Sequence, residues 1–386
     1  MTSYNKTIIT FSHLDKGHGA FSRHKRMAEA LSRKGNNVIW IGKKIKFKEK
    51  ITIIPLRLNF LPNLGFIGLY VKIFFTIFLN LKKINRADSV LAIREYDAFC
   101  LFLNPFLKNA NKVFFSRGDV ISILKINLSD QKNKLRYLID LLTIYSLPII
   151  QKSILKRSNQ VIFQADFLYE IYQERHKKNK ITKIILPNDC QFNSNEKNRH
   201  IKKIDQNFIN LGFISPLFWS CKGLGLIVEM VRLLEKNSTN FVLHIGGDGP
   251  GENKLKLELQ KIIKNNNNIK WYGWVKNVES FFSKIDLLIV PSLYDSNPNI
   301  VLEALSKSVP MLASNIPAHR EMLKYDILQF EIDRIDKMVK KINSFQNSAE
   351  QRLLIKENIQ LRKKSLTFDW DNKINELIIF SHKSNV

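Results

Sequence analysis

The chain has 386 residues, of which 45% are hydrophobic and 25% are charged, and these proportions exclude a disordered or fibrous protein. Its length is too great for one hydrophobic core and predicts two domains of ordinary size. The 61 lysines and arginines against 34 aspartates and glutamates give a net charge of +27, which either attracts an anionic partner or reflects only a lysine-, asparagine- and isoleucine-rich composition.

The cysteines and the first residues indicate the compartment. Three cysteines, scattered and odd in number, show neither a disulfide framework nor the spacing of a zinc site, which fits a reducing cytosol. The apolar run in the N-terminal sequence MTSYNKTIITFSHLDKG is too short for a signal peptide. We therefore expect a cytoplasmic protein.

The first half of the chain alternates strands with helices. Residues 6–11 form a β-branched strand, a turn with Gly17 and Gly19 follows, and an amphipathic helix then runs to Gly35 before the strand at 38–41. Further strands are predicted at residues 89–93, 113–116 and 160–164, with a helix at 135–147. Strands that alternate with helices predict a parallel, doubly wound sheet.

The pattern restarts after a polar linker at residues 188–205. The predicted strands of the second half are residues 208–212, 241–246, 269–272 and 287–290, and the predicted helices are 224–235, 252–264 and 278–284. The sequence therefore predicts an α/β protein with two Rossmann-like domains, residues 1–187 and 206–366, that face a central cleft. Ligands of such sheets bind beyond the carboxyl ends of the strands.

The stretch PSLYDSNPNIVLEAL, residues 291–305, combines two carboxylates with a helix start. Asn299 is the predicted N-cap, and the unpaired N–H groups of the first turn suit a phosphate. Glu303, one turn in, is placed to accept hydrogen bonds from a ribose diol, while Asp295 lies in the preceding loop. The alternative is structural: Asp295 satisfies loop amides, and Glu303 only favours the helix start.

Three other segments have the composition of anion-binding turns. Lys222 precedes Gly223 at a helix start, where a cation opposes the helix dipole, so it either meets an anion or is an exposed lysine without a role. The sequence GGDGP at residues 246–250 is a tight turn or a weak phosphate loop. The sequence KGHG at 16–19 is placed to approach a diphosphate, or is a simple turn.

Together these segments resemble the GT-B glycosyltransferases, in particular glycosyltransferase family 4. The resemblance rests on ILPNDCQF, the Gly212…Lys222-Gly223 segment, GGDGP, WYGWV around Gly273, and the E-x7-E motif, in which Asp295 takes the first acidic position. The ending TFDWDNKINELIIF resembles the family's last helix, at about residues 367–386, which crosses back onto the first domain.

The resemblance implies a retaining transferase that uses a nucleotide sugar and no bound metal or other cofactor. Lys222 would neutralise the diphosphate, Glu303 would hold the ribose, and Asp295 would address the donor sugar, so these three are the predicted catalytic residues. Positive charge and helix ends would stabilise the departing nucleoside diphosphate. The predicted donor-binding residues are Gly17, Gly19, Lys222, Gly247, Gly273, Ser296, Asn297, Pro298, Asn299, Ile300, Val301 and Glu303.

Three positions depart from the family pattern. Asp295 is one methylene shorter than glutamate, which moves its carboxylate and alters which sugar fits. Phe213 follows Gly212 where the family usually has arginine, so Arg117 or Arg320 substitutes, or diphosphate binding is weaker. The family's first-domain histidine has no clear match, and the sequence SRGD at residues 116–119 is the nearest local candidate.

One apolar stretch, LGFIGLYVKIFFTIFLNLKK at residues 64–83, has nearly the length of a membrane span. Lys72 interrupts it, which favours a buried or surface-docking helix. Its aromatic residues beside lysines suit an anionic membrane surface, or are simply core. No nucleic-acid module is recognisable, so we expect no nucleic-acid partner.

The sequence therefore predicts a glycosyltransferase that moves a sugar from a UDP- or GDP-sugar to a glycan or lipid-linked saccharide. We expect it to act in bacterial capsule, O-antigen or lipopolysaccharide biosynthesis, at the inner face of the cytoplasmic membrane. The alternative is a catalytically silent relative that binds glycan or serves as a scaffold.

Overall fold

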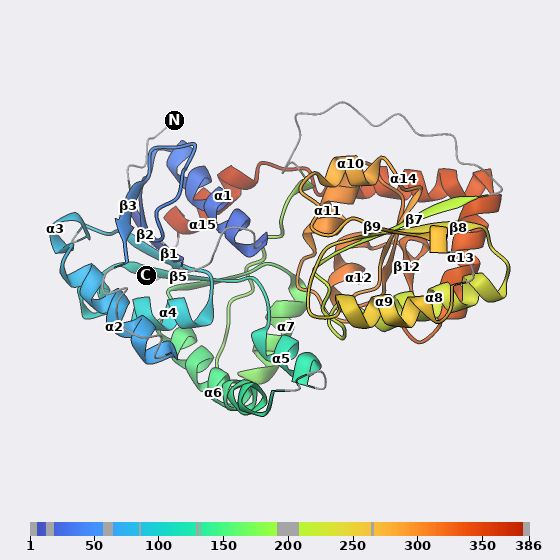
Figure 1. Cartoon of the computed structure of the whole chain (residues 1–386). Helices are drawn as coiled ribbons and strands as arrows, with labels where there is room; N and C mark the ends of the chain where they lie inside the picture. Colours follow the sequence, from blue (N-terminus) through green and yellow to red (C-terminus); the bar gives the residue numbers. More distant parts are fainter. Residues whose placement is uncertain are drawn as a thin grey trace. The chain divides into compact units, whose positions relative to one another are not determined.

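The computed structural model describes residues 6–12, 19–56, 65–84, 86–128, 131, 133–190, 208–263 and 266–380 (Figure 1). It forms two compact units. Unit 1 contains Met1–Asp119, Leu142–Pro187 and Asp369–Val386, and unit 2 contains Val120–Leu141 and Asn188–Phe368. The sequence-based domain boundaries stay predictions, and most of the predicted linker at 188–205 lies outside the described residues.

Unit 1 is built on a parallel sheet with the strand order β3-β2-β1-β4-β5-β6. Its strands are β1 Thr7–Ser12, β2 Asn37–Gly42, β3 Thr52–Pro55, β4 Ser89–Ala92, β5 Asn111–Ser116 and β6 Gln160–Phe163. β4 and β5 are buried along their whole length, as expected for a parallel sheet that is covered on both faces. The order reverses between β1 and β4, which marks a doubly wound topology.

The helices of unit 1 cover this sheet, and the last one returns to the first. They are α1 Gly19–Arg33, α2 Gly65–Phe78, α3 Leu81–Ile84, α4 Glu95–Phe102, the 3-10 turn η1 Pro105–Leu107, most of α6 Lys134–Arg157, α7 Asp166–Arg175 and α15 Trp370–Phe380. α15 packs on α1, where Arg33 pairs with Asp371 at 2.6 Å and Asn36 Nδ2 donates to Asn375 Oδ1 at 2.7 Å. The C-terminal helix therefore joins the first domain, as predicted.

Unit 2 repeats the architecture with the strand order β12-β11-β10-β7-β8-β9. Its strands are β7 Ile209–Ile214, β8 Phe241–Gly246, β9 Ile269–Trp271, β10 Leu287–Val290, β11 Met311–Ser314 and β12 Gln329–Phe330. Its helices are α5 Val120–Asn127, α8 Leu224–Lys236, α9 Glu252–Gln260, α10 Val278–Phe282, α11 Asn299–Ser306, α12 Pro317–Leu323, α13 Ile335–Asn347 and α14 Ala349–Ser365, with 3-10 turns η4 Asn266–Asn268 and η5 Asp326–Leu328. Two doubly wound domains confirm the predicted fold class.

The helix predicted at residues 135–147 is longer in the structure, because α6 continues to Arg157 and contains Pro148. Leu147 and Ile154 are fully buried, so packing on the core outweighs the lost hydrogen bond of the proline.

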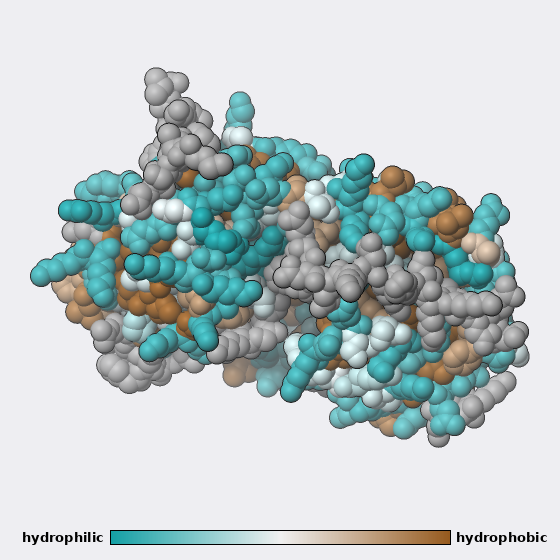
Figure 2. Space-filling model, turned by 90° about the horizontal axis from the view of Figure 1, so that it is seen from above, coloured by the Kyte–Doolittle hydropathy of each residue, from teal (hydrophilic) through white to brown (hydrophobic). Residues whose placement is uncertain are grey.

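The apolar stretch at residues 64–83 divides into α2 and α3. Ile73 and Ile77 are buried, and the ring of Phe74 contacts Phe106 at 5.6 Å, so part of the stretch is core. Phe78 remains 49% exposed. Among the described residues, α6 rather than α2 is the helix long and apolar enough to cross a membrane by length and composition. The side of the molecule drawn in Figure 2 is mostly hydrophilic, in keeping with the charge of +27.

Candidate active site

The predicted site residues of unit 2 lie in loops at the carboxyl ends of its strands. Lys222 follows β7, Gly247 follows β8, Asp295 follows β10, and Glu303 lies on α11, the helix that this last loop enters. The carboxyl ends of parallel strands meet at one edge of a sheet, which brings these loops together.

The structure joins Lys222 directly to Asp295. The ammonium Nζ of Lys222 lies 2.6 Å from Asp295 Oδ2, and about a fifth of each side chain is exposed. Gly223 allows this close approach, because it has a φ of +65° and a Cβ there would lie 1.9 Å from the carbonyl oxygen of Pro291. The two loops are therefore in backbone contact beside the ion pair.

Two backbone hydrogen bonds hold the same loops in register. The N–H groups of Leu293 and Tyr294 donate to the carbonyl oxygen of Cys221, at 3.0 and 3.3 Å. The Cys221 thiol, whose pKa is raised by burial, donates to the Tyr294 carbonyl at 3.4 Å. The position of Lys222 relative to Asp295 is thus set by the main chain as well as by charge.

The ion pair keeps both side chains charged. Burial alone would raise the pKa of Asp295, but the charge and hydrogen bond of Lys222 outweigh it and hold that pKa below its ordinary value. Burial opposes the charge of Lys222 as well, and the Asp295 carboxylate raises its pKa nonetheless. The second oxygen of Asp295 accepts the N–H of Ser296 at 2.8 Å, so the carboxylate also satisfies a loop amide.

His319 was not predicted from the sequence as a site residue. The charges of Asp295 and Lys222 influence its pKa. It is fully buried at the start of α12, and its Nδ1 lies 2.7 Å from the carbonyl oxygen of Ser314. Its Nε2 is buried without a hydrogen-bond partner. Burial lowers the pKa of His319 to about 4 despite the attraction of Asp295, so the imidazole is neutral.

The helix α11 presents its first turn next to the pair. Its N-cap is Pro298 and not Asn299, and because proline has no polar side chain, no side chain caps the helix. The positive end of the helix dipole is therefore not neutralised by a capping side chain. Asn297 in the preceding loop accepts a hydrogen bond from Asn188 Nδ2 at 2.9 Å, while Glu303 lies one turn in and is half-buried.

The remaining predicted residues of α11 are divided between surface and core. Ile300 is half-buried and packs against the core of unit 2, whereas Val301 is fully buried. Their side chains support the helix, and the N–H of Val301 already donates to the carbonyl oxygen of Pro298 at 3.2 Å. A role in ligand binding therefore falls to the backbone N–H of Ile300.

The predicted glycines after β8 and β9 come together through their backbones. Gly247 N–H donates to the carbonyl oxygen of Gly273 at 2.6 Å. Gly247 has a φ of +116°, and a Cβ there would lie 1.8 Å from the carbonyl oxygen of Ser215, so the packing of the turn itself requires glycine. A Cβ built on Gly273 meets no atom within 4 Å, which leaves open space beside it.

Four residues discussed from the sequence lie elsewhere or are differently engaged. Gly17 lies outside the described residues, and Gly19 is the first residue of α1. Phe213 is 2% exposed and belongs to the core of unit 2. Arg320 donates to the carbonyl oxygen of Asn315.

Arg117, the other candidate cation, follows β5 in unit 1. Burial and the neighbouring charges of Arg23 and Arg26 lower its pKa to about 9. Arg23 and Arg26 therefore lie within electrostatic range of Arg117. Asp119 of the SRGD sequence is fully buried and forms a bidentate pair with Arg175, at 2.7 and 2.8 Å.

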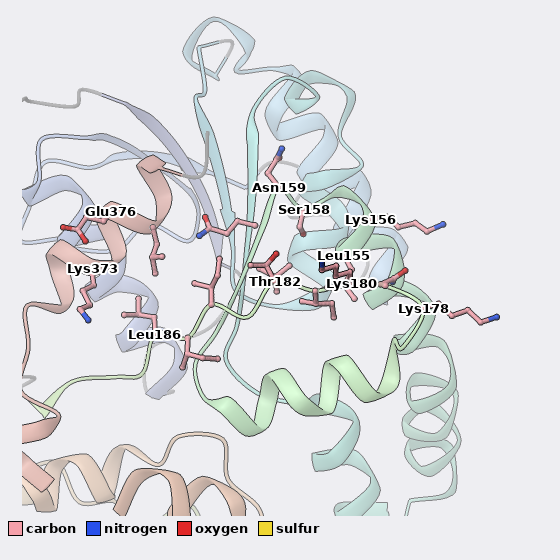
Figure 3. Close-up of a pocket in the computed structure, with 17 residues that line it drawn as sticks. Leu155, Lys156, Ser158, Asn159, Lys178, Lys180, Thr182, Leu186, Lys373 and Glu376 are labelled. Atoms are coloured by element: carbon pink, nitrogen blue, oxygen red, sulfur yellow. The ribbon is translucent and has the colours of Figure 1, made fainter. Parts of the chain in front are cut away.

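A cavity of about 930 Å³ lies in unit 1, and none of the predicted site residues lines it. It is lined by the end of α6, the start of β6, residues 178–186 and α15 (Figure 3). Lys156 and Lys178 at its rim point outward. Within the described part of the chain, no group of three or more histidine, cysteine, aspartate or glutamate side chains is arranged to hold a metal ion.

The model of the family described as glycosyl transferases group 1 matches residues 194–362 of this chain. Protein CapJ of Staphylococcus aureus is 29% identical over 42% of this chain and 40% of its own length. The O-antigen biosynthesis glycosyltransferase WclY of Escherichia coli is 29% identical over 40% of this chain and 42% of its own length.

A third relative is more distant. The UDP-Gal:alpha-D-GlcNAc-diphosphoundecaprenol alpha-1,3-galactosyltransferase of Escherichia coli is 26% identical over 31% of this chain and 32% of its own length. This chain thus aligns with less than half the length of each of these three relatives.

Solved structures match nearly the whole chain. Sucrose-phosphate synthase from Thermosynechococcus elongatus superposes with a TM-score of 0.73 at 13% identity and covers 97% of both chains. HepE of Anabaena, solved in complex with UDP and glucose, gives a TM-score of 0.67 at 14% identity over 98% of this chain and 100% of its own. At these identities the likeness establishes the fold, which is that of the GT-B glycosyltransferases.

Proposed function

We propose that this chain, which has the GT-B fold and matches the model of the group 1 glycosyl transferases over residues 194–362, is a retaining glycosyltransferase. It moves a sugar from a UDP- or GDP-sugar to a glycan or lipid-linked saccharide in bacterial surface polysaccharide assembly. The observation that carries the proposal is the Lys222–Asp295 pair, which lies at the strand ends of unit 2 beside an uncapped helix start.

In the reaction, charge develops on the departing nucleoside diphosphate. Lys222 supplies a cation that Asp295 holds in place, and the first turn of α11 supplies backbone N–H groups from Asn299 and Ile300. The bond from the sugar's anomeric carbon to the diphosphate breaks, the acceptor oxygen bonds to that carbon on the same face, and the acceptor's proton passes to the leaving phosphate.

The remaining predicted residues hold the donor in this arrangement. Glu303 binds the ribose hydroxyls, and Ser296 and Asn297 line the loop in front of the sugar. Gly247 and Gly273 have no side chains and so let the nucleotide approach the backbone closely, which agrees with the open space next to Gly273. Because Asp295 is one methylene shorter than glutamate and is occupied by Lys222, its first task is to position the lysine.

The net charge and the names of the relatives support the proposed acceptor and location. The galactosyltransferase relative is named for a diphosphoundecaprenol-linked acceptor, and HepE was solved with UDP. A lipid-linked acceptor places the enzyme at the cytoplasmic face of an anionic membrane, where a net charge of +27 favours binding.

A catalytically silent relative is the second candidate. It is favoured by Phe213, which fills the core where the family usually carries a cation, and by the neutralisation of Lys222 within the site. Such a protein would bind glycan or act as a scaffold.

The test is to incubate the protein with UDP-glucose, UDP-galactose and GDP-mannose and to measure slow release of UDP or GDP, together with nucleotide binding by calorimetry. Release that is lost in Lys222→Ala and kept in Lys340→Ala, an exposed lysine on α13, supports the enzyme. If the protein neither releases nor binds a nucleotide, the result supports the scaffold. Release only on addition of phosphate would indicate a sugar phosphorylase.

A further inference from the structure

Helix α6 carries two apolar stripes on opposite sides. One stripe is core: Ile144, Leu147 and Ile154 are at most 8% exposed. The other, which we call the outer stripe, consists of Leu135, Leu138, Leu142, Tyr145 and Ile149, and these side chains are 69, 51, 61, 72 and 72% exposed.

The spacing makes the outer stripe one continuous surface of the helix. Its residues follow one another at intervals of three and four positions, which align on one side of an α-helix. From Leu135 to Ile149 the stripe is roughly 21 Å long at 1.5 Å per residue. Single exposed apolar residues are ordinary, whereas five in register on one helix mark a binding surface.

The charges on α6 are arranged around this stripe. Lys134, Lys152, Lys156 and Arg157 are exposed and project within about 80° of its centre at 100° per residue. The single acidic residue of the helix, Asp140, is 7% exposed on the other side, where it pairs with Arg136 at 3.1 Å. The stripe is therefore flanked by cations and has no carboxylate.

We propose that the outer stripe of α6 lies in the interface of an anionic membrane, with its leucines, tyrosine and isoleucine among the acyl chains and its lysines on lipid phosphates. An apolar face bordered by cations is the composition of an interfacial helix. The inference rests on the proposed function only in that a lipid-linked acceptor would be presented at the same surface.

Two other placements of α6 fit less well. A transmembrane orientation would expose the opposite side of the helix, which packs in the protein core and includes the fully buried Gln151. Pairing of the stripe with a second copy of the chain would bring two sets of cations together in proteins that each carry +27. An anionic lipid surface satisfies both the apolar and the charged groups.

The test is co-sedimentation of the full-length protein with vesicles of phosphatidylcholine alone or mixed with phosphatidylglycerol. We expect binding to the mixed vesicles, which weakens as salt is raised, and little binding to phosphatidylcholine alone. The double variant Leu142→Glu/Ile149→Glu is expected to lower vesicle affinity more than tenfold. Leu257→Glu/Leu353→Glu, which alters leucines 59 and 55% exposed on helices of unit 2, is the matched control and should bind as the wild type.

A second arm separates charge from apolar contact. Lys152→Gln and Lys156→Gln should each weaken binding to anionic vesicles about fivefold, the equivalent of about 1 kcal/mol per cation. Equal binding by the stripe variant and its control would overturn the proposal. So would a wild-type dimer in light scattering that Leu142→Glu dissociates, because the stripe would then belong to a second copy.

The same variants keep this inference distinct from the catalytic proposal. Release of UDP or GDP from a nucleotide sugar without vesicles does not involve the outer stripe and should be unchanged in Leu142→Glu/Ile149→Glu. Loss of vesicle binding with normal nucleotide release supports the membrane surface, whereas normal vesicle binding without any nucleotide release defeats only the enzyme. Far-ultraviolet circular dichroism and thermal unfolding confirm that the variant is folded.

Discussion

Two loops of this protein place a carboxylate beside a cation after a parallel strand. They differ in the exposure of the carboxylate and in the hydrogen-bonding capacity that remains for a ligand. In unit 1, Asp119 is fully buried, and both of its oxygens are taken by Arg175. In unit 2, Asp295 and Lys222 share a single close contact and remain partly exposed. The cations of the two pairs are about equally exposed, at 18 and 19%, so the difference lies in the carboxylate, which is fully buried in the first pair and 16% exposed in the second.

The comparison teaches that a charged motif at a strand end does not by itself mark a site. SRGD and YDSNPN each place an aspartate in a loop after a strand, but Asp119 is fully buried and binds Arg175 through both oxygens, which keeps it from a ligand. Lys222 has three donors and one close carboxylate oxygen, so it has capacity for an incoming phosphate. Exposure and spare hydrogen-bonding capacity distinguish the two loops.

The largest expected effect breaks the complete pair. Asp119→Ala leaves the Arg175 guanidinium largely buried without its carboxylate and should lower the free energy of unfolding by about 3–5 kcal/mol. Urea denaturation measures this. The paired change Asp119→Leu/Arg175→Met should recover most of the loss, and a loss as large as that of the single variant would show that the loop needs the charges for another reason.

The next largest effect concerns His319, whose pKa is influenced by the charges of Asp295 and Lys222. Its pKa is about 4 in the folded protein and 6.5 ordinarily, so the unfolded chain binds more protons between these values. Stability should therefore fall as the pH falls from about 6.5 to 4, by on the order of 3 kcal/mol in total.

The measurement is the free energy of unfolding as a function of pH for the wild type and for His319→Gln, which should flatten the slope in that window. Asp336→Asn is the control, because Arg334 holds the pKa of this exposed carboxylate below its ordinary 3.8, so its effect appears only at lower pH and it does not act on His319. An unchanged slope in His319→Gln would assign the pH dependence to other groups.

The fold was largely predictable, because alternating apolar strands and helices, Gly35 after the first helix and the polar linker are local signals. For the candidate site, the sequence indicates only groups that lie close along the chain, as in the segment from Asp295 to Glu303, and their roles stay predictions. The Lys222–Asp295 bond joins residues 73 positions apart, and it depends on the contact of Gly223 with Pro291, which periodicity does not reveal.

Other features were out of reach of sequence patterns for a related reason. His319 carries no local mark of its burial, which tertiary packing decides. The two apolar stripes of α6 give a helix that is apolar nearly all round, so the sequence alone does not tell which side is core. Likewise, the sequence treats Asp119 and Asp295 alike until their partners are known.

The third prediction tests the spare capacity of Lys222. If the lysine stabilises the leaving diphosphate, Lys222→Ala should lower turnover of a nucleotide sugar about 100-fold, or about 2.7 kcal/mol in the barrier. Stability should change by less than about 1–2 kcal/mol, because the pair is partly exposed. Initial rates and urea denaturation of the same preparation give both numbers, and a stability loss larger than the rate loss would make the pair structural like that of Asp119.

The smallest expected effect concerns Glu303, and it distinguishes a nucleotide site on α11 from a helix without a binding role. Glu303→Ala removes the acceptor for the ribose hydroxyls and should weaken UDP or GDP binding about tenfold, or about 1.4 kcal/mol. Glu279→Ala on α10 is the matched control, because this half-exposed carboxylate contacts Lys307 on the surface and should leave the affinity unchanged. Calorimetric titration measures the affinities of both variants for UDP and GDP. Equal affinities would show that Glu303 does not bind the nucleotide, and the ribose would then have to be bound by a residue other than Glu303.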